Sequence, residues 1–372
     1  MTAPLRVFDQ SLSLVAEIDD YESAYFTRSW YDIGDFLIRI NYNKKYATSL
    51  QKGSIIQLHG RPDSTGIITS LTMDVGAGGK GSEQVTATGT ELKHILRWRI
   101  AYPPAGQARY TDNDAAETVI KKFVDAQCGS TADAARQFAS FAVAADQARG
   151  PAYLISARYS VVADELIDCA WASGLSWRVN LDLDTKEYIF EVYEGVDRTA
   201  DQAVNARVIF SPSYDTVQTA QIKHSDINYR SIMLVGGQGV GAARTVVPVY
   251  TGTEPTGFAR REEWIDARDL SSTPDLTARG TQKAAEFANQ DFFTGNALTY
   301  SSIQYRRDFD LGDIVTMSAF GETTDVRVSS ARESWSNNRY DIELGFGRPH
   351  PTITTRVARN QSETAGILNA NE

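Results

Sequence analysis

The sequence is poor in the residues on which many metal sites and disulfide frameworks depend. Its 372 residues include only two cysteines and four histidines. Two cysteines do not make a disulfide framework, so Cys128 and Cys169 are expected to be buried, reduced thiols. No His-x-x-x-His pair and no Cys-x-x-Cys occurs, so we expect no metal ligands. The histidines are scattered along the chain: His59, His94, His224 and His350.

Long apolar runs and clusters of positive charge are missing as well. Met1 to Glu17 holds no apolar core of signal-peptide length. Nowhere do about 18 apolar residues follow one another, as a membrane helix requires. Lys and Arg number 37 against 47 Asp and Glu, which leaves a net charge of −10. General nucleic-acid binding is disfavoured, because affinity for phosphate comes from clustered basic residues.

One glycine-rich segment, Gly236–Gly241, follows an expected strand at 231–235 and is the clearest candidate for a phosphate-binding loop. Such a loop binds phosphate when it opens a helix whose N-terminus faces the anion. Here the β-branched run of 245–250, which contains Pro248, favours another strand. We therefore interpret the segment as a loop between strands and predict no cofactor-binding residue.

Catalytic patterns are equally weak. Asp182 and Asp184 resemble the start of a calcium loop, but Lys186 occupies the third ligand position and the glycine is missing, so a hairpin turn is favoured. No Gly-x-Ser-x-Gly elbow occurs. We predict no catalytic residue. Adjacent carboxylates are interpreted as solvated acidic faces: Asp19-Asp20, Glu262-Glu263 and Glu165/Asp168. The dispersed tryptophans are interpreted as core or interface anchors: Trp30, Trp98, Trp171, Trp177, Trp264 and Trp335.

Hydrophobic periodicity predicts a mainly β protein with helices in the middle. Three segments have helical patterns, at about 113–127, 161–173 and 275–287. Short β-branched runs predict strands before and after them. This order indicates β-barrels or sandwiches that flank an α+β region. The polar tail, about 349–372, is expected to be mobile.

The ends of the predicted helices carry recognisable signals. Asp112 or Asn113 is expected to cap the first helix and Ser160 the second, because short polar side chains accept hydrogen bonds from free N–H groups. Gly129 and Gly174 are expected to end these two helices.

One internal similarity relates the two ends of the chain. A shift of 259 positions pairs Gly53 with Gly312 and, with no gap, pairs Thr65–Ser70 with Thr324–Ser329. Each half then continues to a further strand that ends in glycine. We interpret this as duplication of one small barrel; a chance likeness between short hairpins is the alternative.

The chain as a whole resembles the hub proteins of tailed phages, in particular the siphovirus tail-tip family that also forms the N-terminal part of tail-associated lysins. The resemblance covers roughly residues 5 to 348. Three stretches carry it: Tyr305–Val315 with Tyr340–Gly347, Asn228–Gly239 with Arg260–Arg268, and Phe8–Tyr42 with Gly53–Ile56 and Gly66–Ile68.

The resemblance implies a phage hub fold, with two related tube-like barrels and inserted α+β domains. The implied division is 1–98 for the first barrel, 99–206 for an α+β domain, 207–235 with 298–348 for the discontinuous second barrel, 236–297 for an insert and 349–372 for the tail. Three subunits would present six barrels around one channel. Many relatives continue into a cell-wall-cleaving domain, for which the 25 residues after Gly347 are too few.

The implied function is non-enzymatic: a trimeric ring in the tail tip or baseplate of the virion, assembled in the host cytoplasm. Its partners would be other copies of itself, a distal tail or tube protein, and a central tip, fibre or tape-measure protein. DNA would only pass through the ring, and the chain would not enter a membrane. A tail-associated cell-wall hydrolase and a receptor- or glycan-binding tail module are the alternatives.

Overall fold

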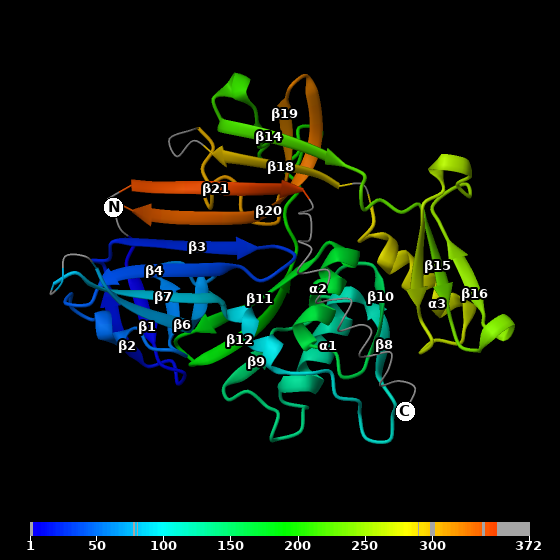
Figure 1. Ribbon diagram of the computed structural model, residues 1–372, viewed down its shortest axis with the longest axis horizontal. Helices are drawn as coiled ribbons and strands as arrows, with labels where there is room; N and C mark the ends of the chain where they lie inside the picture. The colour runs from blue at the N-terminus through cyan, green and yellow to red at the C-terminus, as the bar shows by residue number, and fades with distance from the viewer. Residues whose placement is uncertain are drawn as a thin grey trace.

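A single sheet of thirteen strands dominates the computed structural model, which describes residues 3–76, 79, 81–288, 290–297, 302–336 and 339–347. Figure 1 shows this sheet beside a helical middle region, with a separate insert on the far side. Further sheets of two, three and three strands lie in the middle region and the insert. The prediction of a mainly β fold with α+β insertions is confirmed.

The N-terminal half of the sheet, called here the first half-sheet, is built from seven strands. They are β1 (Leu5–Phe8), β2 (Leu14–Ile18), β3 (Ser23–Ser29), β4 (Asp35–Asn41), β5 (Ile55–Leu58), β6 (Thr65–Val75) and β7 (Glu83–Glu91). Their order in the sheet is β3-β4-β7-β6-β5-β1-β2. Apolar side chains from all seven strands pack into one core, among them Leu5, Phe26 and Ile68.

The second half-sheet comes from the C-terminal part of the chain. Its strands are β13 (Ile209–Phe210), β14 (Val217–Ser225), β18 (Gln290–Ala297), β19 (Ile314–Ala319), β20 (Glu322–Ser336) and β21 (Arg339–Gly347). They have a core of their own, which includes Phe210, Val328 and Phe346. The pairings of the described strands run open from β14 to β2, so they do not close either half-sheet into a barrel.

The two half-sheets repeat one arrangement. The order β5-β6-β7-β4-β3 corresponds to β19-β20-β21-β18-β14. Gly53 and Gly312 both have positive φ, 88° and 95°, and their N–H groups donate to Ile68 O and Val328 O, each at 2.8 Å. A bulge follows in both halves, between Ile68 and Ser70 and between Val328 and Ser330. The internal similarity is thus a repeated strand arrangement.

The predicted alignment of the repeat is wrong by one residue beyond the first strand. Ile55 lies opposite Ile67, whereas Ile314 lies opposite Arg327, so the second strands correspond at a shift of 260. The reason is the hairpin: β19 and β20 are joined by a two-residue turn at 320–321, which changes the register by one position.

The middle region holds two helices and five strands. They are β8 (Tyr110–Ala115), α1 (Ala116–Cys128), β9 (Phe141–Val143), β10 (Ala152–Ala157), α2 (Val162–Ser173), β11 (Ser176–Asp182) and β12 (Glu187–Tyr193). A short 3-10 helix, η2 (Leu92–Trp98), links it to the first half-sheet. Its core includes Phe123, Leu166 and Phe190, and residues from both half-sheets join it, such as Trp30 and Leu311.

The first two helices form near their predicted positions, but the predicted caps are wrong. Residues 110–115 form β8 against β10, so α1 starts at Ala116 and neither Asp112 nor Asn113 caps it. The residue before α2 is Val161, without a side-chain cap, rather than Ser160. Gly174 ends α2 in the left-handed conformation, at φ 75°, as predicted.

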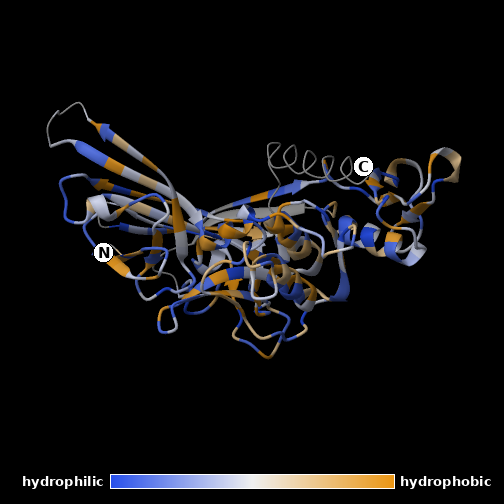
Figure 2. Ribbon diagram, turned by 90° about the horizontal axis from the view of Figure 1, so that it is seen from below, coloured by the Kyte–Doolittle hydropathy of each residue, from blue (hydrophilic) through white to orange (hydrophobic). Residues whose placement is uncertain are grey.

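The insert is a three-stranded sheet with one helix, and Figure 2 shows it at the opposite end of the molecule from the half-sheets. Its elements are β15 (Ile232–Gly236), β16 (Val246–Val249), β17 (Glu262–Asp266) and α3 (Thr273–Ala284). The predicted division counts β15 with the second barrel, yet β15 pairs with β16 and β17. It counts 290–297 with the insert, yet β18 pairs with β14 and β21.

Candidate functional site: the junction between the half-sheets

The two half-sheets join through β3 and β20, which pair antiparallel from Ser29↔Ser330 to Ser23↔Ser336. The joined strands differ in their place: β3 is the outer strand of the first half-sheet, and β20 is an inner strand of the second. The contact is therefore head-to-tail, since each side contributes a different surface.

Arg28 is the central side chain of this junction. Alternation along β3 directs Ala24, Phe26 and Arg28 inward, and Arg28 is only 3% exposed. Its guanidinium donates to Asp310 at 2.7 Å and to the Tyr305 hydroxyl at 2.6 Å, and it forms an ion pair with Asp63 at 2.8 Å. A buried guanidinium requires such partners because an unpaired buried charge is very costly.

Further ion pairs join the same two half-sheets. Arg306 donates to both carboxylate oxygens of Asp63, at 2.8 and 2.9 Å, and approaches Glu333 at 3.1 Å. Glu333 lies on β20, is 2% exposed and also pairs with Arg61. The loop between β5 and β6, the loop before β19, and the strands β3 and β20 thus all contribute to a single network.

The network is balanced in charge: Arg28, Arg61 and Arg306 offset three carboxylates, those of Asp63, Asp310 and Glu333. Burial alone would raise the pKa of Asp63, but Arg28 and Arg306 outweigh it and hold the pKa below its ordinary value. Burial lowers the pKa of Arg28, but its three partners outweigh this and raise the pKa above the usual value. Arg28 and Asp63 are therefore charged at neutral pH.

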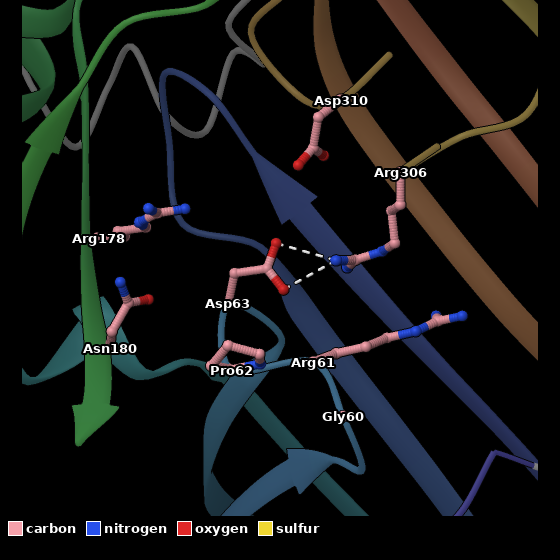
Figure 3. A pocket seen from close by; sticks show the side chains of 8 residues that line it. All are labelled: Gly60, Arg61, Pro62, Asp63, Arg178, Asn180, Arg306 and Asp310. Atoms are coloured by element: carbon pink, nitrogen blue, oxygen red, sulfur yellow. Dashed lines mark hydrogen bonds and ion pairs between the residues drawn. The ribbon is translucent and has the colours of Figure 1, made fainter. Parts of the chain in front are cut away.

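A cavity of about 520 Å³ opens beside this network. Figure 3 shows Asp63 and Arg306 bonded directly to one another among the lining residues, with Arg178 and Asn180 reaching in from β11. Glu191 binds both of these side chains, at 2.9 Å each. The charged side chains that line the cavity thus have partners, although Asn180 Oδ1 is buried without one, and we interpret the cavity as part of a joint rather than as a ligand site.

Trp30 forms a second, apolar anchor directly after β3. Its side chain is fully buried, and its indole Nε1 donates to Gly174 O at 3.3 Å. The Tyr193 ring meets it edge-on at 4.9 Å, and Arg327 lies over it at 5.0 Å. Trp30 therefore ties the first half-sheet to the middle region and to β20 at once.

The segments that suggested ligand chemistry lie elsewhere and have ordinary roles. Gly236–Gly241 ends in a single 3-10 turn and leads to β16, and 182–187 turns between β11 and β12. Cys128 and Cys169 are buried free thiols, as predicted. Among the described residues no group of three or more His, Cys, Asp or Glu is placed to hold a metal, and no helix there is long and apolar enough to cross a membrane.

The interpretation of Glu165 and Asp168 as a solvated acidic face is wrong. Asp168 pairs with Lys283 of α3 at 3.1 Å, because α3 of the insert packs against α2. Burial, and then the neighbouring Asp168, raises the pKa of Glu165 to about 7.

The other carboxylate pairs are at least partly exposed, at Asp19-Asp20 and Glu262-Glu263. Four tryptophans are buried anchors, whereas Trp98 and Trp264 are half exposed.

The sequence interpretation missed the ion-pair network of the junction. One signal was available: Arg28 occupies an inward position of an alternating strand, where an apolar residue is usual, and such a charge indicates a buried partner. The identity of that partner could not be read, because Asp310 lies 282 positions further along the chain.

Comparisons with solved structures find the same fold in phage tail proteins. The 43 kDa tail protein of prophage MuSo2 from Shewanella oneidensis is 12% identical at a TM-score of 0.56, covering 92% of this chain and 97% of that one. The tail protein from Neisseria meningitidis MC58 is 17% identical at 0.56, covering 94% and 97%. The prophage tail protein gp18 from Listeria monocytogenes is 11% identical at 0.58, covering 98% and 100%.

No curated protein sequence matches the chain. One family model matches nearly all of it, however, over residues 4–348, and agrees with the resemblance seen in the sequence. The chain is a phage tail protein that belongs to the Siphovirus ReqiPepy6 Gp37-like family.

Proposed function

We propose that this tail protein is the structural hub of a tail tip or baseplate and works as a ring of three copies around the channel through which DNA leaves. One observation carries the proposal: each chain holds two copies of one strand arrangement, joined head-to-tail through β3 and β20. Head-to-tail contacts that repeat around an axis close into a ring when the rotation from copy to copy adds up to one full turn.

The number of copies follows from the duplication. A sixfold partner, such as a tail tube, offers six equivalent positions, and three chains with two repeats each can occupy all of them. The partners would be a distal tail or tube protein on one side and a central tip, fibre or tape-measure protein on the other. The net charge of −10 suits a wall that does not retain DNA.

Within each copy, we propose that the repeats act as two tube-like barrels that complete their closure in the assembly. The first comprises about 1–98 and the second begins at about 207. β15 pairs with β17 of the insert, and β18 pairs with β21 of the second half-sheet, so we place the insert at about 226–289. Residues 99–206 form the α+β domain, and the proposed tail, 349–372, lies outside the described residues.

The role is structural: the junction is a charge-balanced joint whose groups already have partners. A cell-wall digestion assay with the purified protein tests this directly. Release of soluble fragments from cell walls would contradict a purely structural role.

The mass of the protein in solution tests the ring. We expect 3 × 41.0 = 123 kDa by light scattering after size exclusion, and rings with a central hole in negative-stain images. A monomer, or a two-fold dimer, would contradict the proposal.

A further inference from the structure

The outer part of β6 has a free edge. β5 pairs with β6 only at Thr65–Ile67, whereas β7 pairs with β6 as far as Val75. Among the described strands, nothing pairs with the other side of Ser70–Val75. Met73 and Val75 on this segment are 65% and 69% exposed. Exposed apolar side chains beside a free strand edge are typical of a surface that takes a further strand.

The corresponding segment of the second half-sheet is covered. Ser330–Ser336 of β20 has β21 on one side and β3 on the other. With the two bulges superposed, Met73 corresponds to Glu333 and Val75 to Trp335. Those two residues are only 2% and 4% exposed. The difference in burial comes from the presence of β3 and the core behind it.

The strand that corresponds to β3 is β14. In the first half-sheet β3 pairs with β4, which pairs with β7; in the second, β14 pairs with β18, which pairs with β21. Following the registers across these strands relates Phe26 to Ile222 and Ser29 to Ser225. Among the described strands β14 is the last of the sheet, so none of them pairs with its outer edge.

We propose that β14 of one copy adds antiparallel to β6 of the next, and so repeats between chains the contact that β3 makes with β20 within one chain. This rests on the proposed ring and specifies its interface. The register follows from Ser29↔Ser330: Ser225 lies opposite Ser70, Lys223 opposite Thr72, and Ile222 opposite Met73.

The side chains suit this register. Ile222, which is partly buried, lies opposite Met73, so two apolar side chains contact one another. The equivalent pair within one chain is Phe26 and Glu333. Lys223 lies diagonally across from Asp74 on the same face, at a spacing that long side chains bridge. A lysine on a free edge also discourages wrong pairing of strands, which accounts for Lys223 on an exposed strand.

Paired cysteines test the register in the full-length protein. Directly opposite residues have Cα atoms about 4.5–5.5 Å apart, within reach of a disulfide, whereas diagonal pairs lie about 7–8 Å apart. We expect Met73→Cys combined with Ile222→Cys to give covalent dimers and trimers on mild oxidation. Val75→Cys combined with Ile222→Cys is the matched control and should cross-link several-fold less. Single-cysteine variants set the background, since the native thiols are buried.

The outcomes separate the interface from the ring. A protein of trimeric mass that cross-links equally well in both registers, or in neither, overturns this interface and leaves the ring standing. A chain that stays monomeric at high concentration overturns both.

A charge on the free edge gives a second test that does not need a disulfide. Met73→Lys and Val75→Lys place a cation at exposed positions, so the melting temperature of the single chain should stay unchanged while the trimer is lost. Val15→Lys is the matched control, because Val15 is 50% exposed on β2, a strand that takes no part in the proposed pairing, and should keep the trimer. Loss of the trimer in Val15→Lys alone would overturn the proposal.

Discussion

Two equivalent glycines allow the packing at the junction to be measured separately from backbone strain. Gly53 and Gly312 start corresponding strands with φ of 88° and 95°, a region that residues with a side chain rarely adopt. Replacement by alanine should therefore impose a similar backbone cost at both sites, about 1–2 kcal/mol.

The surroundings of the two glycines differ. A Cβ on Gly312 would lie 1.8 Å from Cζ3 of Trp30, whereas a Cβ on Gly53 would lie 3.0 Å from the flexible end of Gln10. Trp30 would have to leave its place, and loss of a buried tryptophan side chain costs about 3–5 kcal/mol. We expect Gly312→Ala to destabilise the chain by about 3 kcal/mol more than Gly53→Ala.

Thermal unfolding followed by tryptophan fluorescence measures this difference. About 3 kcal/mol corresponds to a melting temperature about 4 °C lower for Gly312→Ala than for Gly53→Ala, because unfolding of 372 residues carries an entropy of about 0.8 kcal/mol/K. Gly60→Ala serves as a control for the backbone alone, since φ is 72° and nothing lies within 4 Å of the added Cβ. Equal losses for Gly53→Ala and Gly312→Ala would refute the reasoning that Trp30 fills this space.

Three further predictions concern titration, thiols and ligands. Burial and Asp168 raise the pKa of Glu165 to about 7, so its protonated form stabilises the fold below about pH 4.5 and this stability is lost as the pH rises through 7. Glu165→Gln should remove this loss of stability between pH 5 and 8. A variant with the same pH dependence of stability as the wild type would contradict the prediction. Cys128 and Cys169 should resist alkylation in the native protein and react after unfolding, with no linkage between them in non-reducing mass spectrometry. Nucleotides and chelators should leave the melting temperature unchanged; a shift of several degrees with a nucleotide would contradict the interpretation of Gly236–Gly241, and one with a chelator would contradict the expected lack of metal ligands.

Local structure was predictable where short-range chemistry decides it. Gly174 ends α2 because a residue without a Cβ adopts the left-handed conformation most readily, and the turn at 182–187 joins two alternating runs. The predicted cap at Asp112 or Asn113 is wrong because the six residues of β8 bond to β10, and a strand ladder outweighs one capping bond.

The sequence by itself determined the fold class, the repeated strand unit, the C-terminal ends of the first two helices and the family. Periodicity, turn residues and motif order are local, so a single chain reveals them. Only the tertiary structure decided that β3 pairs with β20, that Arg28 meets Asp310, and that the repeat is offset by one residue. Each of these depends on groups far apart in the chain, whose contact is set by how the strands pack around shared cores rather than by any nearby residue.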